Sequence, residues 1–212
     1  MRPEYAMNNE YYSGRDFEKD LVGAIDTKNP AYAARLKQLQ ALAVNRGWQP
    51  NQADALPFED AMKLTKEFQP WPDSEDPQKA FAKDLRLAVA DALKLNNEQD
   101  LSRLKFYTAV DGSLDAHHID FFVILASTAG REEYVAFDIT KNPEKDRPVG
   151  TDMILVRDIP DPSDPDYNEK EYLAKIDEIA KQTKEVFLSK MTEREIKKRQ
   201  YKRRPLQPEA QV

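Results

Sequence analysis

Residues 104–140 read LKFYTAVDGSLDAHHIDFFVILASTAGREEYVAFDIT, and this stretch decides the fold of the chain. It holds three runs, 104–110, 115–125 and 134–140, that are rich in Val, Ile, Phe, Tyr and Thr, the residues that favour strands. Turn signals at Asp111-Gly112 and Ala129-Gly130 separate the runs. The stretch therefore predicts an antiparallel meander of three strands.

Two aspartates interrupt these hydrophobic runs near their ends. Because side chains alternate between the faces of a strand, Asp120 is expected on the face of Phe122. For the same reason, Asp138 is expected on the face of Ala136 and Thr140. Ionised carboxylates are seldom buried unless they are paired, hydrogen-bonded or bound to a metal. If the two strands are neighbours, the pair predicts a divalent-cation site; the alternative is that both acids cap backbone groups or pair with Lys and Arg.

Length and composition limit the classes of protein that fit. A chain of 212 residues suits one core with extensions. The absence of cysteine excludes disulfides, thiolate zinc sites and a cysteine nucleophile. The formal net charge of −6 argues against a protein that binds nucleic acid over its whole surface. With no apolar signal region and no run long enough to span a membrane, a cytoplasmic protein without a membrane partner is expected.

Three helices are expected in the N-terminal part of the chain, and a fourth leads into the meander. Apolar residues at helical spacing from Arg15 mark the first, and Asn29-Pro30 opens a second that Gly47 ends. The third covers residues 58–68. Prolines at 70 and 72 then break the pattern, and Asp76-Pro77 starts a helix that leads into the meander and ends near residues 96–97.

The region after the meander predicts one more strand and a long helix. Residues 151–159, TDMILVRDI, indicate a fourth strand. Asn168 with Glu171 forms a capping box for a helix that keeps its period to Met191. Thr192 with Glu195 repeats the capping box and predicts a separate, short basic helix, and the residues from 205 on are expected to be disordered.

The expected fold class is α+β. It has an α-β-β-β core with an antiparallel meander, a further short strand, flanking helices and an N-terminal helical extension. The expected division is a helical extension at 1–72, an α/β core with the long C-terminal helix at 73–191, and a basic, partly disordered tail at 192–212.

The pattern of this region resembles the PD-(D/E)xK nuclease-like superfamily. In it, a helix is followed by a meander whose second strand carries an acid and whose third strand ends in an acid-x-polar triplet. The resemblance covers roughly Asp76 to Ile159. It implies that Asp120, in HHIDFF, and Asp138, in FDIT, ligate Mg²⁺ or Mn²⁺ as the catalytic pair. It also implies a further acid from the preceding helix, for which Asp84 is the candidate, with Asp91 behind it.

The sequence departs from the pattern of this superfamily at the third position of the triplet. Thr140 stands where the family has a lysine that orients and activates water. Lys141 points to the opposite face of a regular strand, so it serves as a stand-in only after a bulge. Lys145, from the loop that follows, is the second stand-in.

The sequence leaves the roles of the two histidines and of one further acid open. On a strand, His117 and His118 would point to opposite faces, which puts His118 on the face of Asp120. It would then touch phosphate or metal, or serve only as a hydrogen-bond partner. Asp152, in GTDMIL, is either a supporting acid or a turn residue.

The end of the chain carries a strongly basic run. Phosphate binding is one reading of this run, and a solvated helix end is the other. The residues assigned to nucleic-acid binding are Lys197, Lys198, Arg199, Lys202, Arg203 and Arg204.

From these features we expect a divalent-metal-dependent nuclease-like protein that hydrolyses phosphodiester bonds in DNA, with RNA as an alternative substrate. One alternative is a member of the same fold that binds nucleic acid or protein without cutting, as Thr140 suggests. Another is a structural or adaptor protein with a protein partner or a homodimer interface through its N-terminal helices. No glycine-rich phosphate loop, Ser-His-Asp order, HExxH pair or dinucleotide fingerprint is present.

Overall fold

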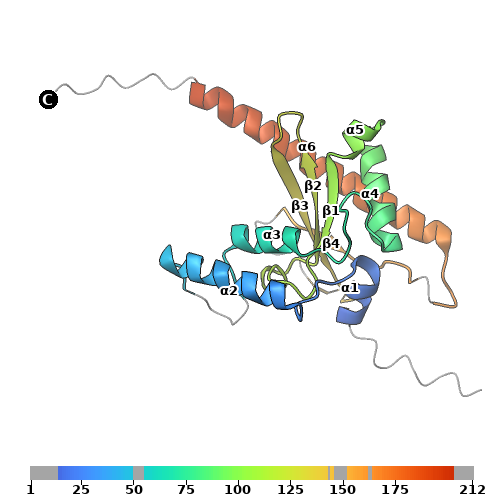
Figure 1. Ribbon diagram of the computed structural model, residues 1–212. Helices are drawn as coiled ribbons and strands as arrows, with labels where there is room; N and C mark the ends of the chain where they lie inside the picture. The colour runs from blue at the N-terminus through green and yellow to red at the C-terminus, as the bar shows by residue number, and fades with distance from the viewer. Residues whose placement is uncertain (1–13, 50–54, 143, 146–151, 162–163, 203–212) are drawn as a thin grey trace, which may run out of the picture.

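The fold is mixed α and β, as the sequence predicts. The computed structural model describes residues 14–49, 55–142, 144–145, 152–161 and 164–202, with residues 195–202 described through their backbone alone. Within these residues, six α-helices surround one four-stranded sheet (Figure 1). None of the helices in this part of the chain has the length and apolar character that crossing a membrane requires.

The sheet contains the predicted meander. Strands β1 (Leu104–Thr108), β2 (Phe121–Ala126) and β3 (Glu132–Ile139) pair as antiparallel neighbours. The fourth strand, β4 (Ile154–Val156), is shorter than the run that predicts it and pairs in parallel with β3. The order across the sheet is β1-β2-β3-β4, so β2 and β3, the strands that lead to the two aspartates, lie in its middle.

Each face of the sheet has its own hydrophobic core. On one face, Phe106, Phe121 and Phe137 stack across three strands with ring centroids 5.0 and 4.3 Å apart. On the other face, Phe122 and its neighbours pack against the second and third helices. Both faces are therefore buried, which explains why these strands are more continuously hydrophobic than a half-exposed strand.

The three helices before the meander form as predicted and cover both faces. The first, α1 (Gly14–Val22), adds Phe17, Leu21 and Val22 to the core around the phenylalanine stack. The other two, α2 (Pro30–Asn45) and α3 (Phe58–Glu67), pack on the opposite face. The Asn29 side chain accepts a hydrogen bond from the N–H of Ala31 and caps α2, and Pro30 is its first residue.

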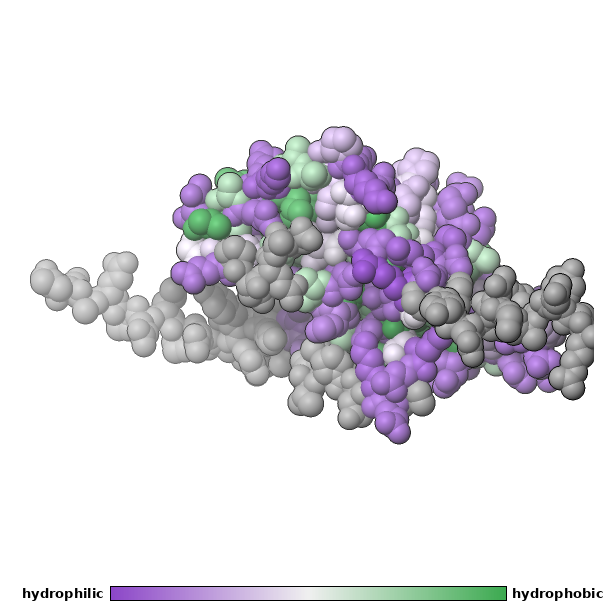
Figure 2. All heavy atoms as spheres, turned by 90° about the horizontal axis from the view of Figure 1, so that it is seen from below, coloured by the Kyte–Doolittle hydropathy of each residue, from purple (hydrophilic) through white to green (hydrophobic). Residues whose placement is uncertain are grey.

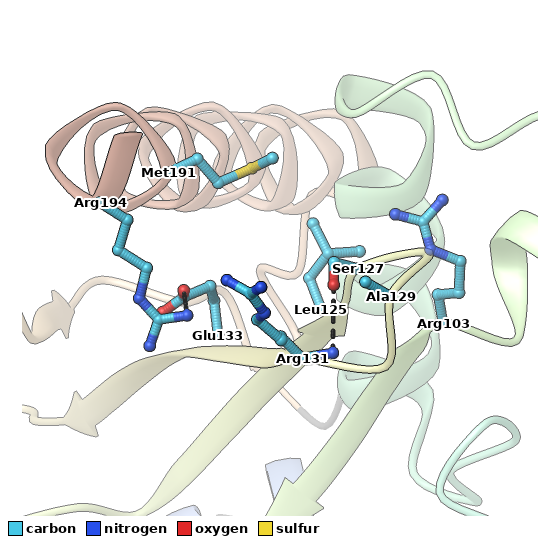
Figure 3. A pocket seen from close by; sticks show the side chains of 8 residues that line it. All are labelled: Arg103, Leu125, Ser127, Ala129, Arg131, Glu133, Met191 and Arg194. Carbon is cyan, nitrogen blue, oxygen red and sulfur yellow. Dashed lines mark hydrogen bonds and ion pairs between the residues drawn. The ribbon is translucent and has the colours of Figure 1, made fainter. Parts of the chain in front are cut away.

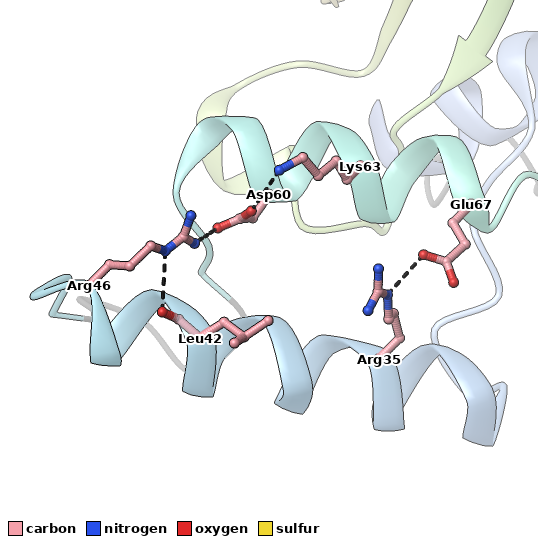
Figure 4. A network of polar contacts seen from close by, with 6 residues as sticks. All are labelled: Arg35, Leu42, Arg46, Asp60, Lys63 and Glu67. Carbon is pink, nitrogen blue, oxygen red and sulfur yellow. Dashed lines mark hydrogen bonds and ion pairs between the residues drawn. The ribbon is translucent and has the colours of Figure 1, made fainter.

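Ion pairs between α2 and α3 surround one buried carboxylate. Asp60, on α3, is 3% exposed and contacts Arg46, which follows α2, and Lys63, one turn further along α3 (Figure 4). The exposed pair of Arg35 and Glu67, at 2.9 Å, joins the same two helices further along. Two cations thus compensate the buried charge of Asp60.

The helix that precedes β1 begins later than the sequence predicts. The prediction of a start at Asp76-Pro77 is wrong, because α4 runs from Ala80–Ala92 and a separate short helix, α5 (Glu98–Leu101), follows. The carbonyl of Ser74 accepts a hydrogen bond from the N–H of Phe106 at 2.8 Å, which ties this segment to β1. The backbone therefore enters α4 only after this contact with β1.

The last helix is continuous where the sequence predicts a break. Helix α6 runs from Glu169–Lys202 and is capped at its start by Asn168, as expected. The second capping box is wrong: the Thr192 hydroxyl donates to the carbonyl of Leu188, four residues back, at 2.9 Å. A threonine that bonds inside a helix does not cap a new one.

The segment before β2 also differs from its prediction as a strand. Residues Asp115–His117 form a 3₁₀ turn, and His118 adopts the left-handed conformation with φ of +59°. Strand β2 begins only at Phe121. The two histidines thus lie outside the strand, so their assignment to opposite strand faces is wrong.

Candidate functional site

Asp120 and Asp138 lie side by side at one end of the sheet. The last registered pair of β2 and β3 joins Phe121 to Phe137, and continuing the register by one residue places Asp138 opposite Asp120. Both acids are buried, with 6% and 3% of their surface exposed. The expectation that the two strands are neighbours is confirmed.

Backbone hydrogen bonds hold Asp120 in place. Its N–H donates to the carbonyl of Phe137 at 2.9 Å, and its carbonyl accepts from Ala109 at 2.7 Å. Its Oδ2 accepts from the N–H of Ile139 at 2.6 Å, so the carboxylate takes up a backbone donor of the adjacent strand. The left-handed turn at His118 brings the chain into this position.

The environment of Asp120 favours its protonated form. Burial is the main cause that raises its pKa from 3.8 to about 8, and the negative charges of Glu18, Asp138 and Asp115 raise it further. The hydrogen bond from Ile139 acts in the opposite direction. Without a cation, the neutral acid is therefore the favoured form of Asp120 at neutral pH.

Asp138 has a cationic partner from the loop that follows β3. The Nζ atom of Lys145 lies 2.8 Å from Oδ1 of Asp138, with hydrogen-bond geometry, and 2.7 Å from Oδ2. The Lys145 side chain is 36% exposed, whereas that of Asp138 is 4% exposed. Lys145, one of the two stand-ins for the lysine of the triplet, is thus in contact with Asp138.

Glu18 of α1 is a third acid near the pair, and sequence reasoning missed it. Burial is the main cause that raises its pKa from 4.5 to about 7. Asp115 and Asp138 raise it further, whereas Lys145 and Arg15 lower it. No local pattern announces this residue, because it lies far from the strands in sequence.

Polar contacts fix α1 against the loop between β1 and β2. Asp111 adopts the left-handed conformation, with φ of +63°. Its carboxylate forms ion pairs with Nη2 of Arg15, 2.5 Å from Oδ1, and with Nζ of Lys19, 2.8 Å from Oδ2. These two cations flank Glu18 on the same helix and hold the pKa of Asp111 below its usual value, against the effect of burial. Helix α1 therefore presents Glu18 toward the acid pair.

Asp84 lies on a different part of the molecule. It is half-buried on α4, where its Oδ2 accepts a hydrogen bond from the Tyr172 hydroxyl of α6 at 2.9 Å. Burial, followed by the hydrogen bond to Asp84 and then the charge of Asp84, raises the pKa of Tyr172. The structure thus joins Asp84 to α6, and Glu18 occupies the position near the acid pair that the sequence assigned to Asp84.

Thr140 and Lys141 make contacts with β4, with the local turn and with α1. Thr140 donates its N–H to the carbonyl of Val156 at 3.0 Å, and its hydroxyl accepts from the N–H of Asn142 at 3.1 Å. Lys141 is exposed, and its Nζ lies 4.2 Å from the centroid of the Phe17 ring. Thr140 thus acts in the local turn and Lys141 in the contact with α1.

The histidines and Asp152 occupy separate positions. His117 shares a hydrogen bond with the carbonyl of Leu56 at 3.0 Å and packs edge-on against Phe58. His118 is exposed, and its charge lowers the pKa of Asp115, which burial raises. Asp152 is 70% exposed and lies 3.5 Å from Lys190 of α6.

The basic run falls largely outside what the structure describes in atomic detail. The backbone of Lys197, Lys198, Arg199 and Lys202 belongs to α6, whereas Arg203 and Arg204 lie outside the described residues. Figure 2 views the molecule from below and shows hydrophilic residues over much of the described surface, with smaller hydrophobic areas between them.

The acid pair suits a cation whose remaining ligands are water molecules or substrate oxygens. No group of three or more histidine or acidic side chains forms a ready ligand set within the described residues. Mg²⁺ is usually held by one or two carboxylates, with water and substrate phosphate completing its six ligands. Two buried carboxylates at opposing strand positions, with Glu18 close enough to affect the pKa of Asp120, match that smaller requirement.

No protein family model, no curated protein and no solved structure matches this chain. Its function must therefore be inferred from the residues themselves.

Proposed function

We propose that this chain is a divalent-metal-dependent, nuclease-like hydrolase of phosphodiester bonds in DNA, with RNA as a second substrate class. The single observation that supports the proposal is the placement of Asp120 opposite Asp138, both buried, with Lys145 in contact with the pair. The burial of Asp120 and the negative charges of Glu18, Asp138 and Asp115 around it create a local preference for a cation.

Each residue has a distinct part in the proposed reaction. Asp120 and Asp138 would hold Mg²⁺ or Mn²⁺, and Glu18 would accept a hydrogen bond from a water on that ion. The bound ion would polarise a phosphate oxygen and lower the pKa of its water. Lys145 would leave Asp138 once the carboxylate binds the ion, and its ammonium would then stabilise negative charge that develops on the phosphate.

The proposal is tested by Mn²⁺ binding and by cleavage, measured on the same variants. Asp120→Asn and Asp138→Asn keep the side-chain shape and remove a charge, so each is expected to weaken Mn²⁺ binding in calorimetry and to abolish cleavage of DNA. The matched control is Glu67→Gln, which removes an exposed carboxylate on α3. Full metal-dependent cleavage by Asp138→Asn would refute the proposal.

A second candidate function is binding of nucleic acid, or of a protein partner, without cleavage. The observation that favours it is the ion pair itself, because Lys145 already compensates Asp138 where the superfamily places a metal. Thr140 in place of the triplet lysine agrees with that reading. Wild-type protein that binds DNA but neither binds Mn²⁺ nor cleaves would support this second function.

A further inference from the structure

A pocket of about 240 Å³ lies at the end of the sheet opposite to the acid pair. It opens between the turn that joins β2 to β3 and the C-terminal half of α6 (Figures 1 and 3). Its polar lining consists of three arginines, one glutamate and one serine, and its apolar lining of three further residues. These are Arg103, Arg131, Arg194, Glu133, Ser127, Leu125, Ala129 and Met191.

Two of the three arginines are held in place by the protein. Arg103 donates from Nε to the carbonyl of Ala126 at 2.7 Å and from Nη1 to Asp100 at 2.8 Å. Arg194, on α6, forms an ion pair with Glu133 of β3 (Figure 3). Cations held in this way are preorganised for an anion, because little side-chain freedom is lost on binding.

The third arginine has no such partner. Arg131 is exposed, and within the described part of the chain its hydrogen bonds come from the backbone: its N–H donates to the Ser127 hydroxyl at 3.1 Å and its carbonyl accepts from the Ser127 N–H at 2.6 Å. Figure 3 shows its side chain beside Leu125 and Glu133, inside the pocket. Asp100 pairs with Arg103 and Glu133 pairs with Arg194, so Arg131 is the guanidinium of the three that is available to a ligand.

The apolar lining of the pocket strengthens the attraction between its arginines and an anion. Leu125 is 7% exposed, while Met191, on α6 above it, is 46% exposed. Apolar groups beside a cation lower the local dielectric constant, so an anion placed there interacts more strongly than on an open surface. This arrangement suits a phosphate group that is joined to a less polar body such as a sugar and base.

We propose that this pocket binds a backbone phosphate of the nucleic acid on which the acid pair acts. The inference rests on the proposed function, because it takes the nucleic acid as the ligand. Arginine forms paired hydrogen bonds with phosphate, and phosphate contacts position a nucleic acid without reading its sequence. With a formal net charge of −6, the chain needs local cationic sites to bind a polyanion at all.

The spacing between the two sites sets the length of substrate that reaches both. Asp120 directly precedes β2 and lies five residues before Leu125, which is about 17 Å at about 3.4 Å per residue. Both faces of the sheet are covered, so about 17 Å is the shortest separation, and at about 3.4 Å per base pair a duplex that reaches both sites spans at least about five base pairs. Duplexes that end closer to that bond would lose this contact.

The experiment measures binding of a fluorescein-labelled DNA duplex to the full chain, by anisotropy, with Ca²⁺ in place of Mg²⁺ to prevent turnover. Arg131→Gln is expected to weaken binding about threefold to tenfold and to lower the slope of log K against log salt by about one. The matched control is Arg35→Gln, which removes an exposed arginine of α2 that pairs with Glu67 (Figure 4). It should leave affinity and slope at their wild-type values.

A series of shorter duplexes completes the test. The difference between wild type and Arg131→Gln is expected to disappear once fewer than about five base pairs remain beyond the acid pair. Wild-type affinity and slope in Arg131→Gln would overturn the proposal, as would a wild type that does not bind DNA. Weaker DNA binding by Arg131→Gln in a protein that never cleaves would support the pocket and refute the nuclease function alone.

Discussion

The carboxylate of Asp120 accepts a hydrogen bond from the backbone N–H of Ile139, the residue that follows Asp138. One acid is thus anchored to the strand that carries the other. Any change in the protonation of Asp120 acts directly on the junction between β2 and β3.

Stability is expected to fall as the pH rises from about 4 to about 8, measured with a chelator present. The folded state keeps Asp120 protonated across this window because its pKa is about 8, whereas the unfolded chain ionises near 3.8. The folded state therefore binds more protons, and one such group lowers the free energy of unfolding by up to about 1.4 kcal/mol per pH unit. Glu18 adds an effect of the same sign between 4.5 and about 7.

Urea denaturation at a series of pH values measures this slope. Asp120→Asn, which is neutral at every pH, should flatten it, while Asp26→Asn, a control in an exposed turn, should not. An Asp120→Asn variant as sensitive to pH as the wild type would contradict the prediction.

Lys145→Met is expected to bind Mn²⁺ about tenfold more tightly, the equivalent of about 1.4 kcal/mol, and to cleave DNA more slowly. The ammonium competes with the metal for Asp138, so its removal favours the metal, but it also removes a cation from the proposed reaction. Calorimetry and a cleavage assay separate the two effects. Lys175→Met, which loses an exposed pair with Glu178 on α6, is the control. Unchanged Mn²⁺ affinity in Lys145→Met would count against the competition.

Gly23→Ala is expected to destabilise the protein by about 2 kcal/mol and to loosen α1. Gly23 has φ of +73°, and a Cβ atom there would lie 2.9 Å from the Trp71 ring, so the substitution adds both backbone strain and a clash. Gly47→Ala has a similar φ of +87° with no atom within 4 Å, so it isolates the backbone effect. Equal losses of stability in the two variants would show that the Trp71 contact is unimportant.

Removing both cations from Asp60 is expected to cost more than the two separate losses combined. Either Arg46 or Lys63 alone still compensates the buried carboxylate, so each single change to Ala should cost about 1 kcal/mol or less. The double variant leaves a buried charge without a partner, which typically costs about 3 kcal/mol or more. Chemical denaturation of the four proteins forms a double-mutant cycle. Additive losses would mean that solvent already screens Asp60.

The sequence predicts those parts of the fold that depend on neighbouring residues. The cap at Asn29, the alternation along 121–126 and 134–139 and the pairing of these runs are local signals, and all of them are confirmed. Because side chains alternate with a period of two, the same pattern that predicts the strands also brings Asp120 opposite Asp138.

Other features depend on contacts between distant segments, and the sequence does not reveal them. The start of α4 is set by the bond between Ser74 and Phe106, and the continuity of α6 by the internal bond of Thr192. Glu18 approaches the acid pair only because α1 docks against the loop that carries Asp111. The division into three segments, the metal and the nucleic-acid partner remain predictions.

The unbroken run of α6 gives the molecule a fixed internal length. At 1.5 Å per residue its 34 residues extend about 51 Å, well beyond the roughly 27 Å of the eight residues of β3. Figure 1 shows the helix passing behind the sheet and continuing past the hairpin that joins β2 to β3. Whatever binds along the projecting half is therefore held at a set reach from Asp120 and Asp138, by a rigid rod in place of a flexible tether.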